Sequence, residues 1–303
     1  MRREVVRRSG RPAPPGVDER ELRRRFEVER RLAKRLRLAP ATDRARLYGE
    51  VYDEYYREIG ATREAGDPEV TRLQRRLLAP LLERRTRFLE IGAGDAALAR
   101  SLVGEVASVT VIEASEGAVG GERLGIDWCW LSPSEAPHRL EPQSVDLAFS
   151  SHFAEHLHPD DLADHLRDVH RWCAPGGSYV MVTPNRLFGP HDVSGYFSHQ
   201  AQGFHLREYT HRELAAAFAQ AGWRDLSTLS GGPLSRPRRL APVLLAERLL
   251  EAILAMAPVA ARDWLLESSP WAARRPFRPL EQVVLLARRS GPDGAPPAPQ
   301  TPG

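Results

Sequence analysis

The sequence is poor in cysteine, in lysine and in long uncharged apolar stretches. Its two cysteines, Cys129 and Cys173, are too few for a disulfide-stapled secreted scaffold or a cysteine-rich zinc module. Lys34 is the only lysine. The most apolar stretch is 243–266, and its longest uncharged run, 252–261, is well under the roughly 18 residues of a membrane span. No apolar signal-peptide segment follows the charged N-terminus. We therefore expect a cytoplasmic protein.

The charge of the 303-residue chain is unevenly distributed. The formal net charge is +3, from 43 basic minus 40 acidic residues, but residues 1–40 hold fourteen basic and six acidic residues, a net of +8. The rest of the chain therefore carries 3 − 8 = −5. A hydrophobic fraction of 42% is enough for a sizeable core and excludes a wholly disordered chain. The length suggests one large or two small domains.

Composition and periodicity divide the chain into segments. Arg, Pro and Gly dominate the first residues, and Gly and Pro the last ones, which predicts disorder at both ends. Apolar residues spaced by three and four predict helices over 21–38 and 43–59, and Asp67-Pro68 is a typical start for a third. The predicted divisions are a basic arm (1–19), N-terminal helices (20–85), a core (86–230), a helical insertion (231–280), a final core strand (281–289) and a disordered tail (290–303).

The helix predicted over 43–59 carries a stripe of tyrosines. A packing face is the favoured interpretation, and a lid over a substrate is the alternative. From Arg87 the pattern changes to short apolar runs that alternate with helical segments, and Thr210 and Glu213 fit a capping box at a later helix start. This alternation predicts an α/β fold, a seven-stranded, mostly parallel sheet with helices on both faces. The predicted strands cover 88–91, 108–113, 126–131, 145–150, 178–183, 223–229 and 282–288.

A glycine turn after the first of these strands is the strongest local signal. Gly92 permits a tight turn, and Gly94 allows a ligand to approach the backbone. Glu113 ends the next strand, nineteen residues after Gly94, where an acid can accept hydrogen bonds from both hydroxyls of a ribose. Gly92-x-Gly94-x-x-Ala97 also fits the dinucleotide fingerprint, and a tight turn without any ligand is a further alternative.

Two acids argue against a dinucleotide. Glu90 precedes the turn, and Asp95 adds negative charge where a pyrophosphate would be repelled. The site therefore favours a cofactor that carries a ribose and a positive charge but no phosphate. An NAD-dependent oxidoreductase is kept as an alternative, to be tested by which cofactor raises the melting temperature.

Glu90-x-Gly92-x-Gly94 followed by Glu113 resembles the class I S-adenosylmethionine (SAM)-dependent methyltransferases of types 11 and 23. The resemblance covers about 86–230 and the last strand. It implies a Rossmann-like fold, SAM as the cofactor and methyl transfer as the activity. Where such enzymes carry an acidic loop after the third strand, this sequence has Ser and Glu. The cofactor contacts that the resemblance implies are Glu90, Gly92, Ala93, Gly94, Glu113, Ala114, Ser134, Glu135 and Ser150.

Histidines crowd the loops after the fourth and fifth strands. A histidine can act as the general base that takes the proton of an attacking hydroxyl, and we expect catalytic roles for His152, Glu155, His156 and His205. The pair Glu155-His156, with the later His205, resembles ubiquinone-biosynthesis O-methyltransferases and small-RNA 2′-O-methyltransferases, in which such residues hold a divalent metal. His152 stands where those enzymes have an acid, so a nitrogen-rich site would favour Zn²⁺ or Mn²⁺ over Mg²⁺.

Structural roles are the alternative for this cluster. Glu155 can simply favour the N-terminal end of the following helix, and His156 can be a hydrogen-bonded loop residue without a metal. The expected acceptor is a hydroxyl of a small molecule such as a sugar, a glycolipid or a natural product, because polar and aromatic residues fill the loops. An RNA 2′-O-methyltransferase with a basic arm is one alternative, which the acidic body disfavours, and a non-catalytic SAM-binding subunit is another. The amphipathic stretch 243–266 could cover a substrate, form a dimer or touch a membrane surface.

Overall fold

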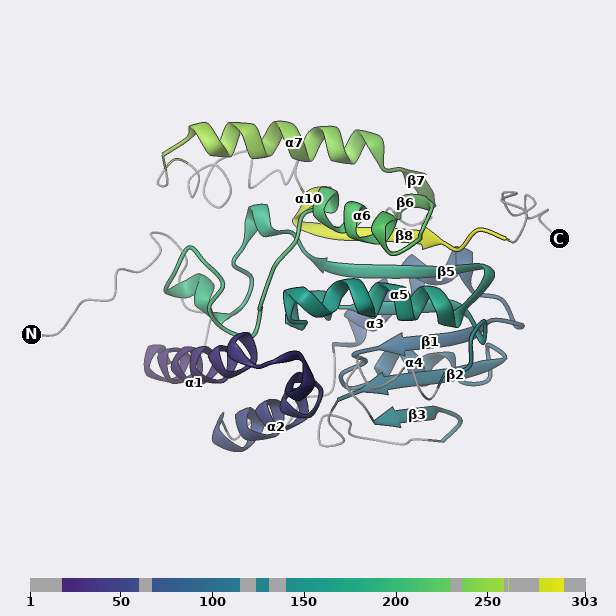
Figure 1. Ribbon diagram of the computed structural model, residues 1–303, viewed down its shortest axis with the longest axis horizontal. Coiled ribbons are helices and arrows are strands. Elements are labelled where there is room, and N and C mark those ends of the chain that lie inside the picture. Colours follow the sequence, from purple (N-terminus) through teal and green to yellow (C-terminus); the bar gives the residue numbers. More distant parts are fainter. Residues whose placement is uncertain are drawn as a thin grey trace, which may run out of the picture.

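The computed structural model describes residues 18–59, 67–114, 124–130, 140–229, 236–258, 261 and 278–291. An eight-stranded sheet lies at the centre of the molecule, with the strand order β3-β2-β1-β4-β5-β8-β6-β7 (Figure 1). Its strands are β1 (Arg87–Ile91), β2 (Ser108–Glu113), β3 (Asp127–Trp130), β4 (Val145–Ser151), β5 (Cys173–Pro184), β6 (Asp225–Leu229), β7 (Pro237–Arg239) and β8 (Gln282–Arg288).

The first five strands pair in parallel, and the chain reverses its direction of winding between β1 and β4. In an open parallel sheet this reversal leaves a crevice at the carboxyl ends of the two strands, where ligands bind. Strand β8 runs antiparallel between β5 and β6. The fold class is thus the predicted Rossmann-like α/β sheet.

The sheet has one strand more than predicted. The extra strand, β7, lies within the stretch predicted as a helical insertion. It pairs antiparallel with β6, with Ser227 opposite Arg239 and Leu229 opposite Pro237. Its sequence, Pro-Arg-Arg, has no apolar alternation. An edge strand needs only backbone pairing, so no side-chain pattern announces it. Strand β5 also begins five residues earlier than predicted, at Cys173, across a register shift in its pairing with β4.

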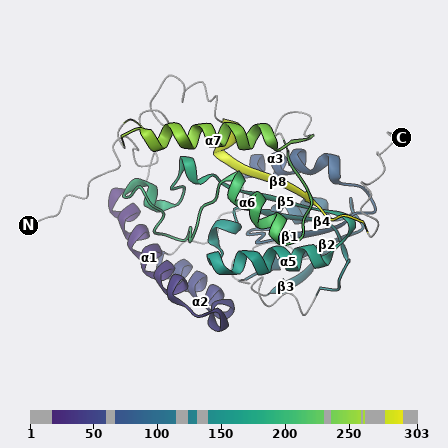
Figure 2. The same ribbon diagram turned by 45° about the horizontal axis from the view of Figure 1, so that its top comes forward.

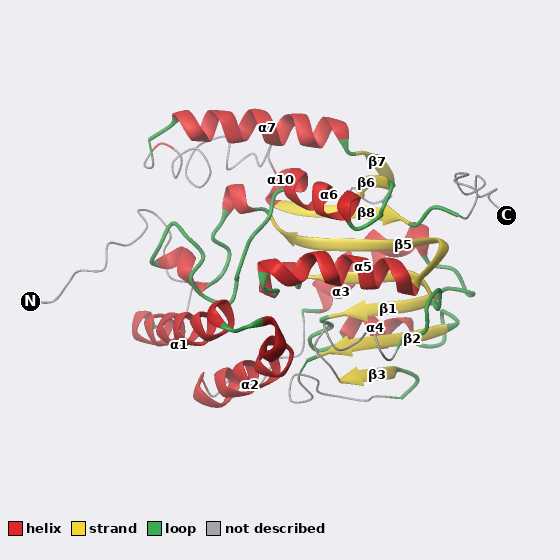
Figure 3. Cartoon of the chain, in the orientation of Figure 1, coloured by secondary structure: helices red, strands yellow, loops and turns green. Residues whose placement is uncertain are grey.

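Helices cover both faces of the sheet (Figure 3). On β1, Phe88 packs with α3 (Pro68–Leu78) and α4 (Ala97–Leu102), whereas Leu89 and Ile91 pack with α5 (Leu162–Trp172) and α6 (His211–Gln220), as the period of two along a strand requires. The helices are α1 (Glu19–Leu38), α2 (Ala41–Ile59), α3 (Pro68–Leu78), α4 (Ala97–Leu102), α5 (Leu162–Trp172), α6 (His211–Gln220), α7 (Ala241–Met256) and α10 (Arg278–Glu281), with 3-10 turns at Ala79–Leu81, Ala154–His156, Pro159–Asp161, Arg186–Phe188 and Val193–Tyr196.

Helices α1 and α2 form a hairpin at the carboxyl-end side of the sheet (Figure 2). Tyr48 and Tyr55 of α2 are buried in a cluster with Leu32 of α1 and Phe204 of the loop that precedes α6. The tyrosine stripe is therefore a packing face that joins the hairpin to that loop. Asp67 caps α3, and Thr210 and Glu213 form the predicted capping box of α6.

Several predictions fall outside the described residues. These are most of the basic arm and of the tail, the loop that carries Ser134 and Glu135, and most of 259–277. Helix α1 begins at Glu19, the last residue of the predicted arm, with Asp18 as its N-cap. Among the described helices, none is long and apolar enough to cross a membrane.

Candidate functional site

The glycine turn after β1 has a left-handed backbone. Gly92 and Gly94 have φ angles of 66° and 64°, and Ala96 follows at 55°. A Cβ atom on Gly92 would lie 2.5 Å from Cδ2 of Phe153, which follows β4. Glycine is needed at position 92 for two reasons, the backbone angle and the aromatic ring that occupies the space of a side chain.

Glu113 connects the end of β2 to this turn. Its Oε2 accepts a hydrogen bond from the Gly94 amide (2.9 Å), and its Oε1 accepts one from the Ala114 amide (2.8 Å). Each carboxylate oxygen has a second lone pair. The fold therefore brings the predicted ribose-binding acid into contact with the glycine turn.

Glu90 lies inside the molecule beneath the turn. Its Oε2 accepts a hydrogen bond from the Ala99 amide of α4 (2.9 Å), so the carboxyl group anchors that helix to β1. Burial, assisted by the negative charges of Asp95 and Glu113, raises the pKa of Glu90 to about 8. A cation bound near this carboxyl group would favour its ionised form.

The other predicted cofactor contacts have different surroundings. Ala93 and Ala114 are half-buried at the turn and at the end of β2. Ser150 is fully buried, and its hydroxyl is hydrogen bonded to that of Tyr179 (2.8 Å), which lies 3.0 Å from Nε2 of His165. Ser134 and Glu135 are outside the described residues.

The predicted metal ligands lie together. Glu155, His156 and His205 each offer one ligand atom, and these atoms all lie within 4.8 Å of one another. Glu155 and His156 belong to the 3-10 turn that follows β4, and His205 belongs to the loop that follows β5. The Arg207 amide donates to the Glu155 carbonyl (3.2 Å), which holds the two segments side by side.

The neighbours of the two histidines determine which ring nitrogen is free. Nδ1 of His156 lies 3.1 Å from the Phe204 carbonyl, and because a carbonyl only accepts, this nitrogen carries the hydrogen. Nδ1 of His205 is hydrogen bonded to Oε1 of Glu208 (2.6 Å). In the neutral form of each ring the lone pair therefore resides on Nε2, as a metal ligand requires. Burial lowers the pKa of His156 to about 4, so this ring is neutral at pH 7.

Glu155 is a fully buried carboxylate whose two oxygens have different surroundings. Its Oε2 accepts a hydrogen bond from the Thr183 hydroxyl (2.8 Å), whereas its Oε1 has no hydrogen-bond partner among the described residues. Nδ1 of His152 lies 3.2 Å from Oε1. Burial would raise the pKa of this carboxyl group, but His152 and two further histidines lower it to about 2. A buried, ionised oxygen without a donor fits a bound cation.

Four residues that sequence reasoning did not assign complete the surroundings of the cluster. The Tyr52 hydroxyl oxygen lies 3.0 Å from the same Nδ1 of His156, and Thr183, Phe204 and Glu208 contact the three ligands as described above. The spacing of three between His205 and Glu208 was the one local signal available. Tyr52 and Thr183 lie far from their partners along the chain, so no local pattern reveals them.

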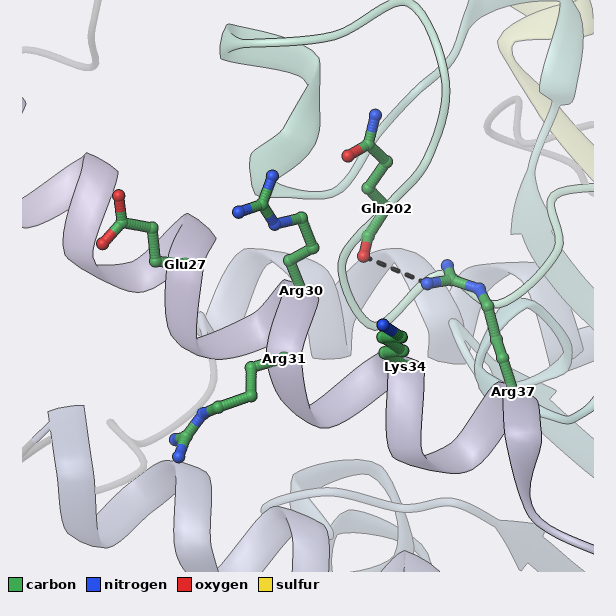
Figure 4. A pocket seen from close by; sticks show the side chains of 6 residues that line it. All are labelled: Glu27, Arg30, Arg31, Lys34, Arg37 and Gln202. Carbon is green, nitrogen blue, oxygen red and sulfur yellow. Dashed lines mark hydrogen bonds between the residues drawn. The ribbon is translucent and has the colours of Figure 1, made fainter.

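A second concave surface lies between α1 and the loop before α6 (Figure 4). It encloses about 530 Å³. Arg31 faces the acids of α2, and Arg37 donates to the carbonyl oxygens of Gln202 (3.1 Å) and His205 (3.0 Å). We call this concave surface the cationic groove. It is lined by Glu27, Arg30, Arg31, Lys34, Arg37 and Gln202. Arg37 thus joins this groove to the backbone of a predicted metal ligand.

Comparison with known proteins identifies the family. A protein-family model described as "Methyltransferase domain" matches residues 62–228, more than half of the chain. No curated protein matches the sequence. Similar solved structures include a SAM-dependent methyltransferase from Archaeoglobus fulgidus, with 16% identity, a TM-score of 0.49, and coverage of 80% of this chain and all of that one (100%).

Two further structures have similar scores. A SAM-dependent methyltransferase from Mesorhizobium loti shares 18% identity at a TM-score of 0.45 and covers 74% of this chain and 99% of its own. Phosphoethanolamine N-methyltransferase 2 from Haemonchus contortus shares 17% identity at a TM-score of 0.47 and covers 92% of this chain and 62% of its own. The family match, together with the glycine turn and the acid at the end of β2, shows that the chain belongs to the methyltransferase domain family and is a class I SAM-dependent methyltransferase.

Proposed function

We propose that this methyltransferase transfers a methyl group to a hydroxyl of a small-molecule acceptor, such as a sugar, a glycolipid or a natural product, at a divalent metal held by Glu155, His156 and His205. The observation that supports the metal is the convergence of three ligand atoms within 4.8 Å, one of them from a buried carboxylate whose Oε1 lacks a hydrogen-bond donor. The cluster lies at the carboxyl ends of β4 and β5, beside the crevice that the strand order creates.

SAM supplies an electrophilic methyl group when bound, and a divalent cation at the cluster would make an acceptor hydroxyl more acidic. The chain's own residues supply position and charge. Glu113 and the turn at Gly92–Gly94 fit the ribose and the amino-acid part of the cofactor, as the resemblance implied. Glu155 offers an ionised oxygen, and each histidine in its neutral form offers Nε2, because its Nδ1 atom is already hydrogen bonded.

His152 is placed to move the proton. Its side chain is 51% exposed, and its Nδ1 lies 3.2 Å from Glu155 Oε1. A neutral imidazole here can accept the hydroxyl proton while the oxygen bonds to the methyl carbon and the bond from carbon to sulfur breaks, so that S-adenosylhomocysteine leaves. The nitrogen-rich ligand set favours Zn²⁺ or Mn²⁺ over Mg²⁺.

RNA 2′-O-methylation is a second candidate, and the cationic groove favours it. Lys34 and Arg30 form no ion pair with a described residue, and the groove opens beside the loop that holds His205. A small acceptor with an acidic group fits these features equally well. The net charge of −5 outside residues 1–40 is unfavourable for a polyanion, so the small acceptor is preferred.

The test is methyl transfer from labelled SAM to a panel of sugars, glycolipids, polyketides and RNA. We expect label in a small acceptor, loss of transfer on chelation, and recovery with Mn²⁺ or Zn²⁺. Glu155→Gln should abolish the recovery but keep the rise in melting temperature that SAM produces. Glu50→Gln, an exposed acid of α2, is the matched control. Label in RNA alone would overturn the small acceptor, and transfer insensitive to chelation would overturn the metal.

A further inference from the structure

Helix α7 presents an apolar face to solvent. Leu245, Leu249, Ile253 and Met256 are exposed to 60%, 57%, 50% and 80%. At about 100° per residue these four side chains fall within an arc of about 80° on one side of the helix. They are four of the nine large hydrophobic side chains that are exposed in the described part of the chain. Together they form an outer stripe along the length of α7.

The opposite face fixes the orientation of the helix. Glu247 is 1% exposed, and it accepts hydrogen bonds from Asn185 Nδ2 (2.8 Å), the His211 amide (2.8 Å) and the Arg212 amide (3.0 Å). Leu250 and Leu254 are buried on the same side. A rotation that turned the outer stripe inward would break these hydrogen bonds and expose the inner leucines. Helix α7 is apolar on both faces, and the protein covers only one of them. The uncovered apolar face therefore indicates a contact with another surface.

The charges around the outer stripe have one sign. Arg236, Arg238, Arg239 and Arg248 are exposed, and none of them forms an ion pair with a described residue. The segment 236–256 has two acids. Glu247 is buried as described, and Glu251 is paired with arginines of other elements. The segment therefore combines four exposed arginines, which pair with no acid in the described part of the chain, with a continuous apolar stripe.

We propose that residues 236–256, β7 and α7, form a docking surface for an anionic lipid bilayer. Apolar side chains on one side of an interfacial helix enter the boundary of the acyl chains, while arginines contact headgroup phosphates. Helix α7 lies at the outer edge of the molecule in both views, so that its length can lie along a plane (Figures 1 and 2). The surface is independent of the acceptor proposed above.

A second copy of the chain is the competing occupant. A two-fold contact through α7 would pair this segment with itself, so that the four arginines would face only groups of the same segment in the other copy. No unpaired acid in the described part of 236–256 would face them. The charge pattern therefore favours the bilayer over a dimer.

The experiment is co-sedimentation of the full chain with vesicles. We expect binding to vesicles of phosphatidylcholine and phosphatidylglycerol in equal parts, at least tenfold weaker binding to phosphatidylcholine alone, and binding that declines as salt is added. Leu249→Ser with Ile253→Ser should weaken binding at least tenfold. The matched control is Val70→Ser with Leu73→Ser, a pair of similar exposure on α3 (50% and 48%), which should bind as the unaltered chain does.

Charge reversal provides a second variant that leaves the apolar stripe intact. Arg238→Glu with Arg239→Glu should weaken binding to the anionic vesicles and keep the rise in melting temperature that SAM produces, which shows that the core is folded. No binding to either vesicle, or equal binding by all variants, would overturn the proposal. A concentration-dependent dimer that the Leu249 and Ile253 substitutions dissociate, without vesicle binding, would assign the surface to a second copy. None of these measurements depends on methyl transfer.

Discussion

Nδ1 of His205 lies 2.6 Å from Oε1 of Glu208, and both side chains are buried. The same carboxylate accepts a hydrogen bond from the His191 amide (2.7 Å). Burial would raise the pKa of Glu208, but the two histidines lower it to about 2, so it is an acceptor at pH 7. A carboxylate that holds the far nitrogen of a ligating histidine fixes the orientation and the basicity of the ring.

Glu208→Gln should therefore weaken metal binding by about 10–100-fold, because the amide holds His205 without the negative charge. Titration calorimetry with Mn²⁺ and Zn²⁺ gives the affinity. The rise in melting temperature with SAM should not change, because Glu208 is a positioning residue for the cluster and does not reach the glycine turn. Equal metal affinity in Glu208→Gln and in the Glu50→Gln control would contradict this role.

Gly92→Ala should destabilise the fold more than Gly104→Ala. Both glycines have a positive φ, 66° and 80°, but a Cβ on Gly92 would meet Phe153 at 2.5 Å, whereas one on Gly104 would have nothing within 4 Å. We expect a loss of about 1 kcal/mol of unfolding free energy for Gly104→Ala. The loss for Gly92→Ala should be greater by about 1–3 kcal/mol, as measured by urea denaturation.

The double variant Gly92→Ala with Phe153→Ala separates the two causes of this loss. Removal of the ring eliminates the clash and leaves the backbone strain, so the two substitutions should cost less together than the sum of their separate costs. Additive losses would show that the ring does not determine the requirement for glycine.

Glu29 of α1 should make stability depend on pH. Its Oε1 accepts from the Tyr55 hydroxyl (3.1 Å), and burial, with the charge of Asp192, raises its pKa from 4.5 to about 7. Between these pH values the folded chain binds the proton and the unfolded chain does not, so stability falls as pH rises, by roughly 3 kcal/mol in total. The stability that the folded chain gains by holding the proton on Glu29 is complete below pH 4.5 and is lost above about pH 7.

Glu29→Gln should flatten this part of the stability curve, because the amide does not titrate. Urea denaturation of both proteins across the interval gives the two slopes. Parallel curves for the unaltered chain and the variant would show that Glu29 does not carry the effect.

Glu247→Ala should destabilise the chain by about 2–4 kcal/mol, because it leaves the buried donors of Asn185, His211 and Arg212 without an acceptor. Glu251 lies on the same helix and forms exposed ion pairs with Arg186 and Arg212, so Glu251→Ala should cost about 0.5 kcal/mol. Urea denaturation compares the two. Similar losses would mean that Glu247 does not anchor α7 to the start of α6.

Much of the core could be predicted because its signals are local. The first strand was predicted at 88–91 and extends over Arg87–Ile91, and the capping box at Thr210 is present. Strand β7 was missed because an edge strand is determined by the neighbour that it pairs with. The start of β5 was missed because residues 174–177 resemble a turn, although β5 already pairs with β4 at Cys173.

Part of the candidate cluster was named from the sequence. Resemblance named Glu155, His156 and His205, and the fold places their ligand atoms together. Tyr52, Thr183 and Glu208 were not predicted, because their contacts with these ligands depend on the packing of separate segments.

By itself, the sequence determined the alternation of strands and helices, the glycine turn and the acid that follows it, because periodicity, caps and turn residues act over a few positions. Only the tertiary structure decided which nitrogen of each histidine is free, which oxygen of Glu155 lacks a donor, and that α7 turns its carboxylate inward and its leucines outward. These features arise where residues far apart in the chain compete for the same hydrogen bonds and the same buried space, and no local pattern records the outcome.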